Sequence, residues 1–104
     1  MENKKLLQSI LEKADDMIGD VAYGQASKIE GVEIEEGKVT GDIGQRHLEA
    51  LLDSFEDIMG EAAYGVFRES IREVYKEDST VKNVDLPNKA VPKEVRAEKF
   101  ASAL

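Results

Sequence analysis

Cysteine and tryptophan are absent from this 104-residue chain, proline occurs twice and histidine once. Without cysteine, neither a disulfide framework nor a thiolate metal site is available. The absence of disulfides fits a reducing cytoplasm, which is the expected location. No apolar run approaches the ~18 residues that a membrane span needs, and the first residues lack the apolar core of a signal peptide. The sequence therefore predicts no membrane insertion.

Acidic side chains outnumber basic ones, and the net charge is −8. Residues 1–79 carry nine basic and nineteen acidic side chains, whereas residues 80–104 carry five basic and three acidic ones. The acidic body repels phosphate backbones and anionic lipids, so neither nucleic acid nor a membrane is an expected partner. We predict two regions, a helical body over 1–79 and a basic C-terminal arm over 80–104. Because exposed ion pairs contribute little, we expect burial of Phe100 to dock the arm on the body, within the chain or across to another copy.

A short pattern occurs twice. The run Gly19-Asp20-Val21-Ala22-Tyr23-Gly24 returns 41 residues later as Gly60-Glu61-Ala62-Ala63-Tyr64-Gly65. Seven identities relate segment 7–30 to segment 48–71, where ordinary residue usage gives about one or two. Because self-similarity at a fixed offset reports architecture, the sequence predicts two similar helical segments joined by a connector.

Apolar residues spaced three and four apart predict two long helices, over 3–30 and 43–77. The predicted buried face of the first comprises Leu7, Ile10, Leu11, Ala14, Met17, Ile18 and Val21. The face of the second includes Leu48, Leu51, Leu52, Phe55, Ile58, Met59, Val66 and Phe67. Asn3 and Asp42 are expected to begin these helices, and Gly31 to cap the first. The second helix, roughly 50 Å long, is expected either to kink near Gly60 or Gly65 or to be covered by another chain.

Between the helices, residues 32–40 alternate apolar and charged side chains around Glu36-Gly37, which predicts a small β-hairpin. An isolated hairpin is marginal in water, so it must pack on a helix or pair with a third strand, for which 81–86 is the candidate. The expected fold class is mainly α: two long antiparallel helices, a small β-hairpin between them and a C-terminal arm.

The glycines of the repeat need an explanation, since glycine inside a helix costs about 1 kcal/mol relative to alanine. On a helical wheel they lie, with the tyrosines, beside the main apolar face. We interpret this flank as a contact surface for another helix, the arm or a second subunit. The predicted interface residues are Gly19, Tyr23, Ala26, Gly60, Tyr64, Phe67 and Phe100. The alternative is that the tyrosines lie on their own helices and the glycines only mark kinks.

Catalytic, cofactor and metal sites are not expected. Glu12, Asp16 and Asp20 form an acidic stripe, as do the equivalent Asp53, Asp57 and Glu61. Carboxylate clusters suit divalent cations, but the helical wheel turns these residues to solvent and no Glu-x-x-His motif accompanies them. His47 is expected on the surface. No nucleophile motif and no glycine-rich phosphate loop occurs, so the sequence does not predict an enzyme.

The run Leu48-Glu49-Ala50-Leu51-Leu52, continuing through Gly60-Glu61-Ala62-Ala63 to Ile71, resembles small archaeal helical domains, some of which are called output domains. The resemblance implies an all-α, non-catalytic interaction or signalling domain. The expected function is a non-enzymatic scaffold domain that self-associates through helix faces, most simply as a homodimer, or that binds another protein. The alternative is a sensor domain that holds a small molecule or metal between the helices near Tyr23 and Tyr64.

Overall fold

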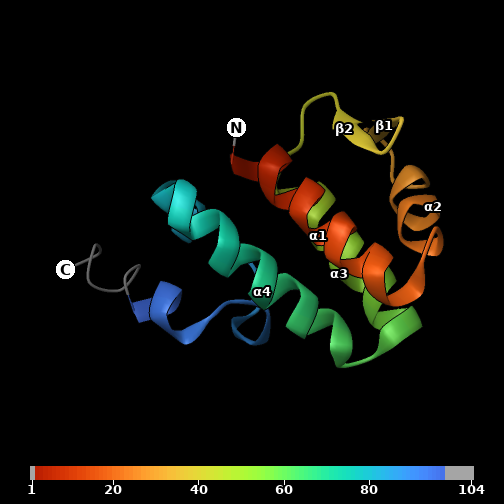
Figure 1. Cartoon of the computed structure of the whole chain (residues 1–104). Helices are drawn as coiled ribbons and strands as arrows, with labels where there is room; N and C mark the ends of the chain where they lie inside the picture. Colours follow the sequence, from red (N-terminus) through yellow and green to blue (C-terminus); the bar gives the residue numbers. More distant parts are fainter. Residues whose placement is uncertain (1, 98–104) are drawn as a thin grey trace.

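A computed structural model of the chain describes residues 2–97 and is mainly helical, with one small antiparallel hairpin (Figure 1). The elements are α1 (Glu2–Ile18), α2 (Val21–Ser27), β1 (Glu33–Glu35), β2 (Lys38–Thr40), α3 (Gln45–Met59), α4 (Ala62–Glu77) and the 3-10 helices η1 (Ser79–Asn83) and η2 (Asn88–Ala90). Residues 93–97 are helical again. A mainly helical chain with a small hairpin is therefore confirmed. Within the described part, every helix is too short or too polar to span a bilayer.

The core lies where three helices meet. Helices α1 and α4 lie side by side and run in opposite directions, with α3 behind α1 (Figure 1). Ion pairs join the exposed edges of α1 and α4: Lys5 Nζ lies 3.7 Å from Glu77 Oε2, and Lys13 Nζ lies 2.9 Å from Glu73 Oε2. The largest fully buried side chains are Phe55, Phe67, Leu6, Leu7, Ile10, Leu11, Leu48, Leu51 and Ile71. Most of the predicted apolar faces are thus buried within one chain.

The two predicted long helices are each interrupted at a glycine of the repeat. Segment 3–30 divides at Gly19 into α1 and α2, and segment 43–77 divides at Gly60 into α3 and α4. Each predicted long helix is therefore divided into two shorter helices, and a kink near Gly60 is one of the alternatives that the sequence allowed. The antiparallel neighbours are α1 and α4, which is a pairing across the two segments.

The two interruptions share a positive φ at the glycine and the same pattern of backbone hydrogen bonds. Gly19 has φ 69° and Gly60 has φ 60°, a region that side chains disfavour. In both turns the glycine amide donates to the carbonyl four residues earlier, at 2.8 Å for Gly19 and 2.9 Å for Gly60. In both, the amide three residues later donates to the glycine carbonyl at 3.1 Å. The repeated sequence pattern therefore corresponds to a repeated helix–turn–helix geometry.

The predicted hairpin is confirmed, with Ile34 opposite Val39 in an antiparallel register. Glu36 and Gly37 both have positive φ, as a tight two-residue hairpin turn requires. The hairpin packs on α1, where the Gln8 amide nitrogen donates to the Gly37 carbonyl at 2.9 Å and its oxygen accepts from the Val39 amide at 2.7 Å. The expected third strand over 81–86 is wrong, since the first half of that segment belongs to η1 and the sheet has two strands among the described residues.

The first part of the predicted arm belongs to the same core as the helices. Val81, Val84, Leu86, Val91 and Val95 are all buried. Elements η1 and η2 pack along α4, and η1 also contacts α1. Residues 80–97 are therefore docked on the body of their own chain. Phe100, which was expected to anchor the arm, lies outside the described residues.

Candidate functional site

The predicted interface residues do not form one surface. Ala26 and Phe67 are fully buried in the core of the single chain, so they contact its own helices and are closed to a second subunit. An ideal Cβ at Gly19 or Gly60 would meet no heavy atom within 4 Å. Close helix approach is therefore the wrong explanation for these glycines, and the positive φ of the turns is the right one. Phe100 lies outside the described residues.

The hydroxyl of Tyr64 contacts the helix that precedes its turn, and Tyr23 lies near the carboxylates of α1. The Tyr64 hydroxyl donates to Glu56 Oε2 at 2.8 Å, and this hydrogen bond raises the pKa of Tyr64. Partial burial raises the pKa of Tyr23, with smaller contributions from Glu12, Asp15 and Asp16 of α1. Asp15 and Glu56 occupy equivalent positions of the repeat. Tyr64 therefore makes its hydrogen bond within its own helix–turn–helix unit.

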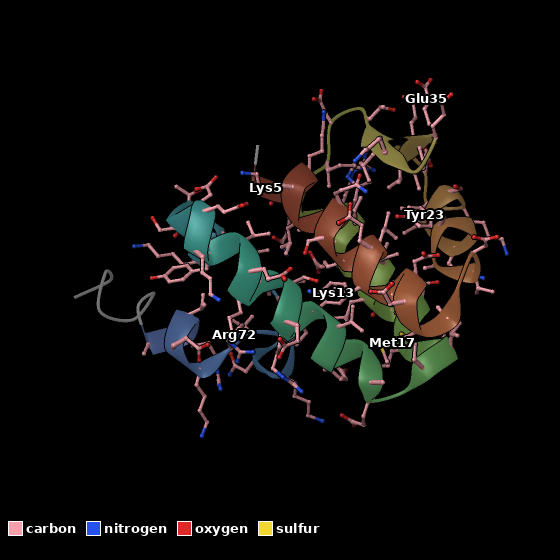
Figure 2. All side chains as sticks on the ribbon, viewed as in Figure 1. Lys5, Lys13, Met17, Tyr23, Glu35 and Arg72 are labelled. Atoms are coloured by element: carbon pink, nitrogen blue, oxygen red, sulfur yellow. The ribbon has the colours of Figure 1, made fainter. Side chains whose placement is uncertain are left out.

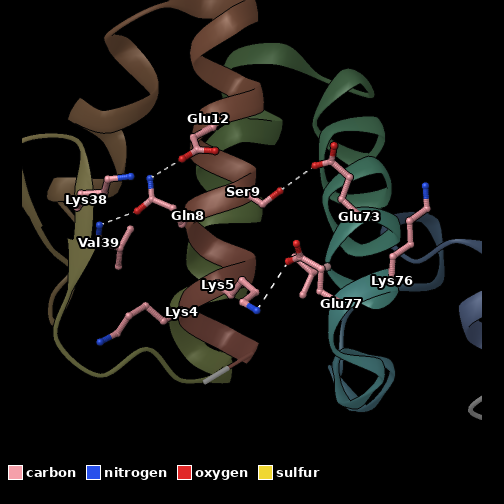
Figure 3. A pocket seen from close by; sticks show the side chains of 11 residues that line it. Lys4, Lys5, Gln8, Ser9, Glu12, Lys38, Val39, Glu73, Lys76 and Glu77 are labelled. Atoms are coloured by element: carbon pink, nitrogen blue, oxygen red, sulfur yellow. Dashed lines mark hydrogen bonds and ion pairs between the residues drawn. The ribbon is translucent and has the colours of Figure 1, made fainter.

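One hollow is an open groove of about 810 Å³ whose floor is α1 and whose walls are the hairpin and the end of α4 (Figure 3). It is lined by Lys4, Lys5, Gln8, Ser9, Glu12, Lys38, Val39, Glu73, Val74, Lys76 and Glu77. Figure 3 shows many of its polar groups paired with one another, including Gln8 with Glu12 and Lys5 with Glu77. Lysines and glutamates are nearly balanced in number, so the groove offers no strong charge of one sign.

The groove contains a serine next to a carboxylate, but the pair is poorly suited to nucleophilic chemistry. Ser9 Oγ lies 3.4 Å from Glu73 Oε2. The hydrogen bond from Lys13 lowers the pKa of Glu73, which makes this carboxylate a weaker base. Glu73 is also exposed, so burial raises its pKa less than the hydrogen bond from Lys13 lowers it.

His47 was expected on the surface, and that prediction is wrong. Its side chain is buried, and Nδ1 accepts a hydrogen bond from the Gly44 amide at 2.8 Å. Helix α3 thus begins after Gly44 and not at Asp42. The ring packs so closely on Gly31 that a Cβ there would lie 2.6 Å from Nε2. Glycine is therefore required at position 31 by the contact with the His47 ring and by its positive φ. Gly31 was expected to cap the first helix, but the C-cap of α2 is Lys28.

Large apolar side chains are exposed at one end of the molecule, at residues that the sequence analysis placed in the buried faces. Met17 is 57% exposed, Val21 48% and Ile58 43%. Met17 and Ile58 are equivalent in the repeat, each two residues before its glycine, and Val21 follows Gly19 by two residues. Figure 1 shows both glycine turns at the same end of the bundle, and Figure 2 labels Met17 there. We call this surface the glycine-turn end.

Carboxylates flank the exposed apolar residues of the glycine-turn end. Asp16 and Asp20 lie on either side of the first turn, and Asp57 and Glu61 on either side of the second; all four are exposed. Between His47 and Phe67 the chain has no lysine or arginine, so the second turn has no cation of its own segment. Lys89 approaches Glu61 from the C-terminal region at 3.8 Å. The glycine-turn end therefore combines apolar surface with an acidic rim.

These carboxylates do not converge. Among residues 2–97, no three histidine or acidic side chains are placed to share a metal ion. The described groove and hollows are lined by residues other than Tyr23 and Tyr64, so a ligand site between the tyrosines gains no support. No family model, curated protein or solved structure matches this chain. The chemistry and placement of its own residues are therefore what support a function.

Proposed function

We propose that this chain is a non-enzymatic interaction domain that binds another protein through its glycine-turn end. The observation that carries the proposal is the exposure of Met17, Val21 and Ile58 at equivalent or adjacent positions of the two turns. Exposed apolar side chains scattered singly are ordinary, but apolar surface gathered at one end and rimmed by polar residues is typical of protein interaction sites.

The acidic rim indicates the chemistry of the partner. A segment with apolar side chains flanked by lysine or arginine would bury Met17 and Ile58 while its cations meet Asp16, Asp20 and Asp57. Complementary charge mainly speeds encounter and selects the partner, whereas burial of the apolar residues supplies most of the affinity. An amphipathic helix lying in this position is one of the recurring forms of peptide recognition.

Self-association, the occupant expected from the sequence, stays a prediction, and two of its supports are gone. The long second helix is divided at Gly60, and Phe67 and Ala26 are used by the core. A symmetric contact through the glycine-turn end would set the four rim carboxylates of one copy against those of the other, which is unfavourable. We therefore propose that the partner is a segment with apolar and basic side chains. Binding of a second copy of the chain is one of the results that the test distinguishes.

The test uses an amphipathic helical peptide of leucine and lysine as the probe, with a leucine–glutamate peptide as its matched control. Nuclear magnetic resonance of methyl-labelled protein is expected to show saturable shifts at the Met17, Val21 and Ile58 methyl groups with the first peptide only. Solution mass is measured in parallel at ~100 μM. Shifts confined to other surfaces would contradict the proposal, and a dimer whose contact shifts the same methyl groups would replace the partner by a second copy.

A further inference from the structure

Basic side chains gather on a different face, where the C-terminal region crosses α4. A hollow of about 340 Å³ is lined there by Arg68, Arg72, Lys89, Lys93 and Arg96, together with Asn88, Val91, Pro92 and Glu94. Glu94 is the one acidic residue among these lining residues. Five cations around one hollow stand out in a chain of net charge −8.

Two of the arginines are engaged by the protein itself. Arg72 Nε donates to Glu94 Oε1 at 2.7 Å, and its Nη1 donates to Glu69 Oε1 at 2.7 Å. Arg68 Nη1 donates to the carbonyl of Lys89. These bonds hold the C-terminal region on α4 and fix the walls of the hollow. The ion pair with Arg72 also compensates the charge of Glu94, so this carboxylate does not neutralise the other cations of the hollow.

Arg96 is not satisfied in this way. Its Nε is buried and has no hydrogen-bond partner among the described residues. A buried donor without an acceptor is unfavourable, and in native proteins such a group usually reports a water, an ion or a ligand. Lys93 and Lys89, both exposed, lie on the rim of the same hollow. This donor without an acceptor therefore lies beside other cations of the hollow, of which Lys89 also lies 3.8 Å from Glu61 Oε1.

We propose that this hollow binds a phosphate group, as the free ion or as the monoester of a small molecule, with the guanidinium of Arg96 and the ammonium groups of Lys89 and Lys93 as the cations that line it. A guanidinium presents its N–H groups in a planar fork that fits the oxygens of a phosphate, and lysine adds a point charge. The hollow has room for a single phosphate with a small substituent. A nucleic-acid backbone would meet the acidic body as well, which disfavours it.

The test titrates isotope-labelled full-length protein with inorganic phosphate, and separately with glycerol phosphate, at ionic strength held constant with chloride. The expected result is a saturable shift of the Arg96 Nε–Hε resonance and of the Lys93 amide, at millimolar phosphate. Glycerol phosphate binding more tightly assigns the site to monoesters, and equal affinity assigns it to the free ion. Shifts that rise linearly without saturation, or that chloride reproduces, would overturn the proposal.

Variants separate the site from general attraction of anions. Lys93→Gln changes an exposed side chain and is expected to keep the fold while weakening phosphate binding several-fold. Arg96→Gln is expected to weaken it at least about tenfold, the loss that one charge-assisted hydrogen bond corresponds to. Arg46→Gln is the control, since Arg46 is an exposed cation of α3 outside the hollow. If the Lys93→Gln and Arg46→Gln variants bind phosphate with the same affinity, whether unchanged or reduced, the hollow is not a defined phosphate site.

Discussion

Replacement of Gly60 by alanine is expected to destabilise the fold, although alanine is the better helix former. Gly60 has φ 60° and ψ −136°, a conformation that is essentially restricted to glycine. Because an added Cβ would meet no heavy atom within 4 Å, overpacking does not contribute. The expected loss therefore comes from the backbone alone and amounts to about 1–3 kcal/mol.

Gly65, five residues later in the same motif, provides the matched control. It lies inside α4 and is not among the glycines with positive φ. A Cβ there would lie 3.7 Å from Arg68 Nη2, an ordinary van der Waals distance. Gly65→Ala is therefore expected to stabilise the protein by about 0.5–1 kcal/mol, the usual difference between the two residues in a helix.

Urea unfolding followed by far-ultraviolet circular dichroism measures both variants. The free energies of unfolding are expected to move in opposite directions, and a change of 1 kcal/mol corresponds to about 4–8 °C in Tm for a domain of this size. A Gly60→Ala variant as stable as the unmodified protein would refute the assignment of the break to a positive-φ turn. Destabilisation of both variants would restore the close helix approach that the sequence first indicated.

Two further predictions concern polar contacts. Gln8→Ala removes two hydrogen bonds to the hairpin, at about 0.5–1.5 kcal/mol each, and is expected to accelerate hydrogen exchange of the Val39 amide; unchanged exchange would show that Gln8 does not hold the hairpin. The hydrogen bond from Arg72 lowers the pKa of Glu94 below its ordinary value of 4.5. The ion pair therefore stabilises the fold fully above pH 4.5, and this contribution is lost as the pH falls through the lower pKa of the folded protein. Unfolding free energies measured from pH 7 downward are expected to fall less steeply in Glu94→Gln than in the unmodified protein, with Glu35→Gln as an exposed control, and equal slopes in all three would contradict this.

The hairpin and the existence of the helices were predictable because their signals are local. Alternation around Glu36-Gly37 and steps of three and four among the leucines depend on neighbouring residues alone. The sequence allowed kinks at the glycines but did not show what causes the breaks at Gly19 and Gly60, because the apolar pattern continues across both residues. Only the backbone geometry shows that the pattern there belongs to two helices and not to one.

The burial of side chains was harder to predict where it depends on packing between segments that are distant in the sequence. Met17 and Ile58 continue the apolar stripe in the sequence, yet each lies one residue before the end of its helix and is exposed. His47 looks like a surface residue until Gly31, sixteen residues earlier, is brought against its ring. Met17 and Ile58 each lie two residues before a glycine of the repeat. If these glycines are interpreted as turns, this shared position is the sequence signal that the two side chains lie at helix ends.

The central claim, that the glycine-turn end is a protein-docking surface, is tested most directly by the affinity of the leucine–lysine peptide for a Met17→Gln/Ile58→Gln variant. About half of each side chain remains to be buried, so the pair is expected to supply about 2 kcal/mol, close to a thirtyfold change in Kd. Isothermal titration calorimetry compares this variant with the unmodified protein and with Glu35→Gln/Glu36→Gln, which alters exposed charges of the hairpin. Weaker binding is expected in the first variant and little change in the second; equal affinity in all three proteins would show that the peptide does not dock on the glycine-turn end.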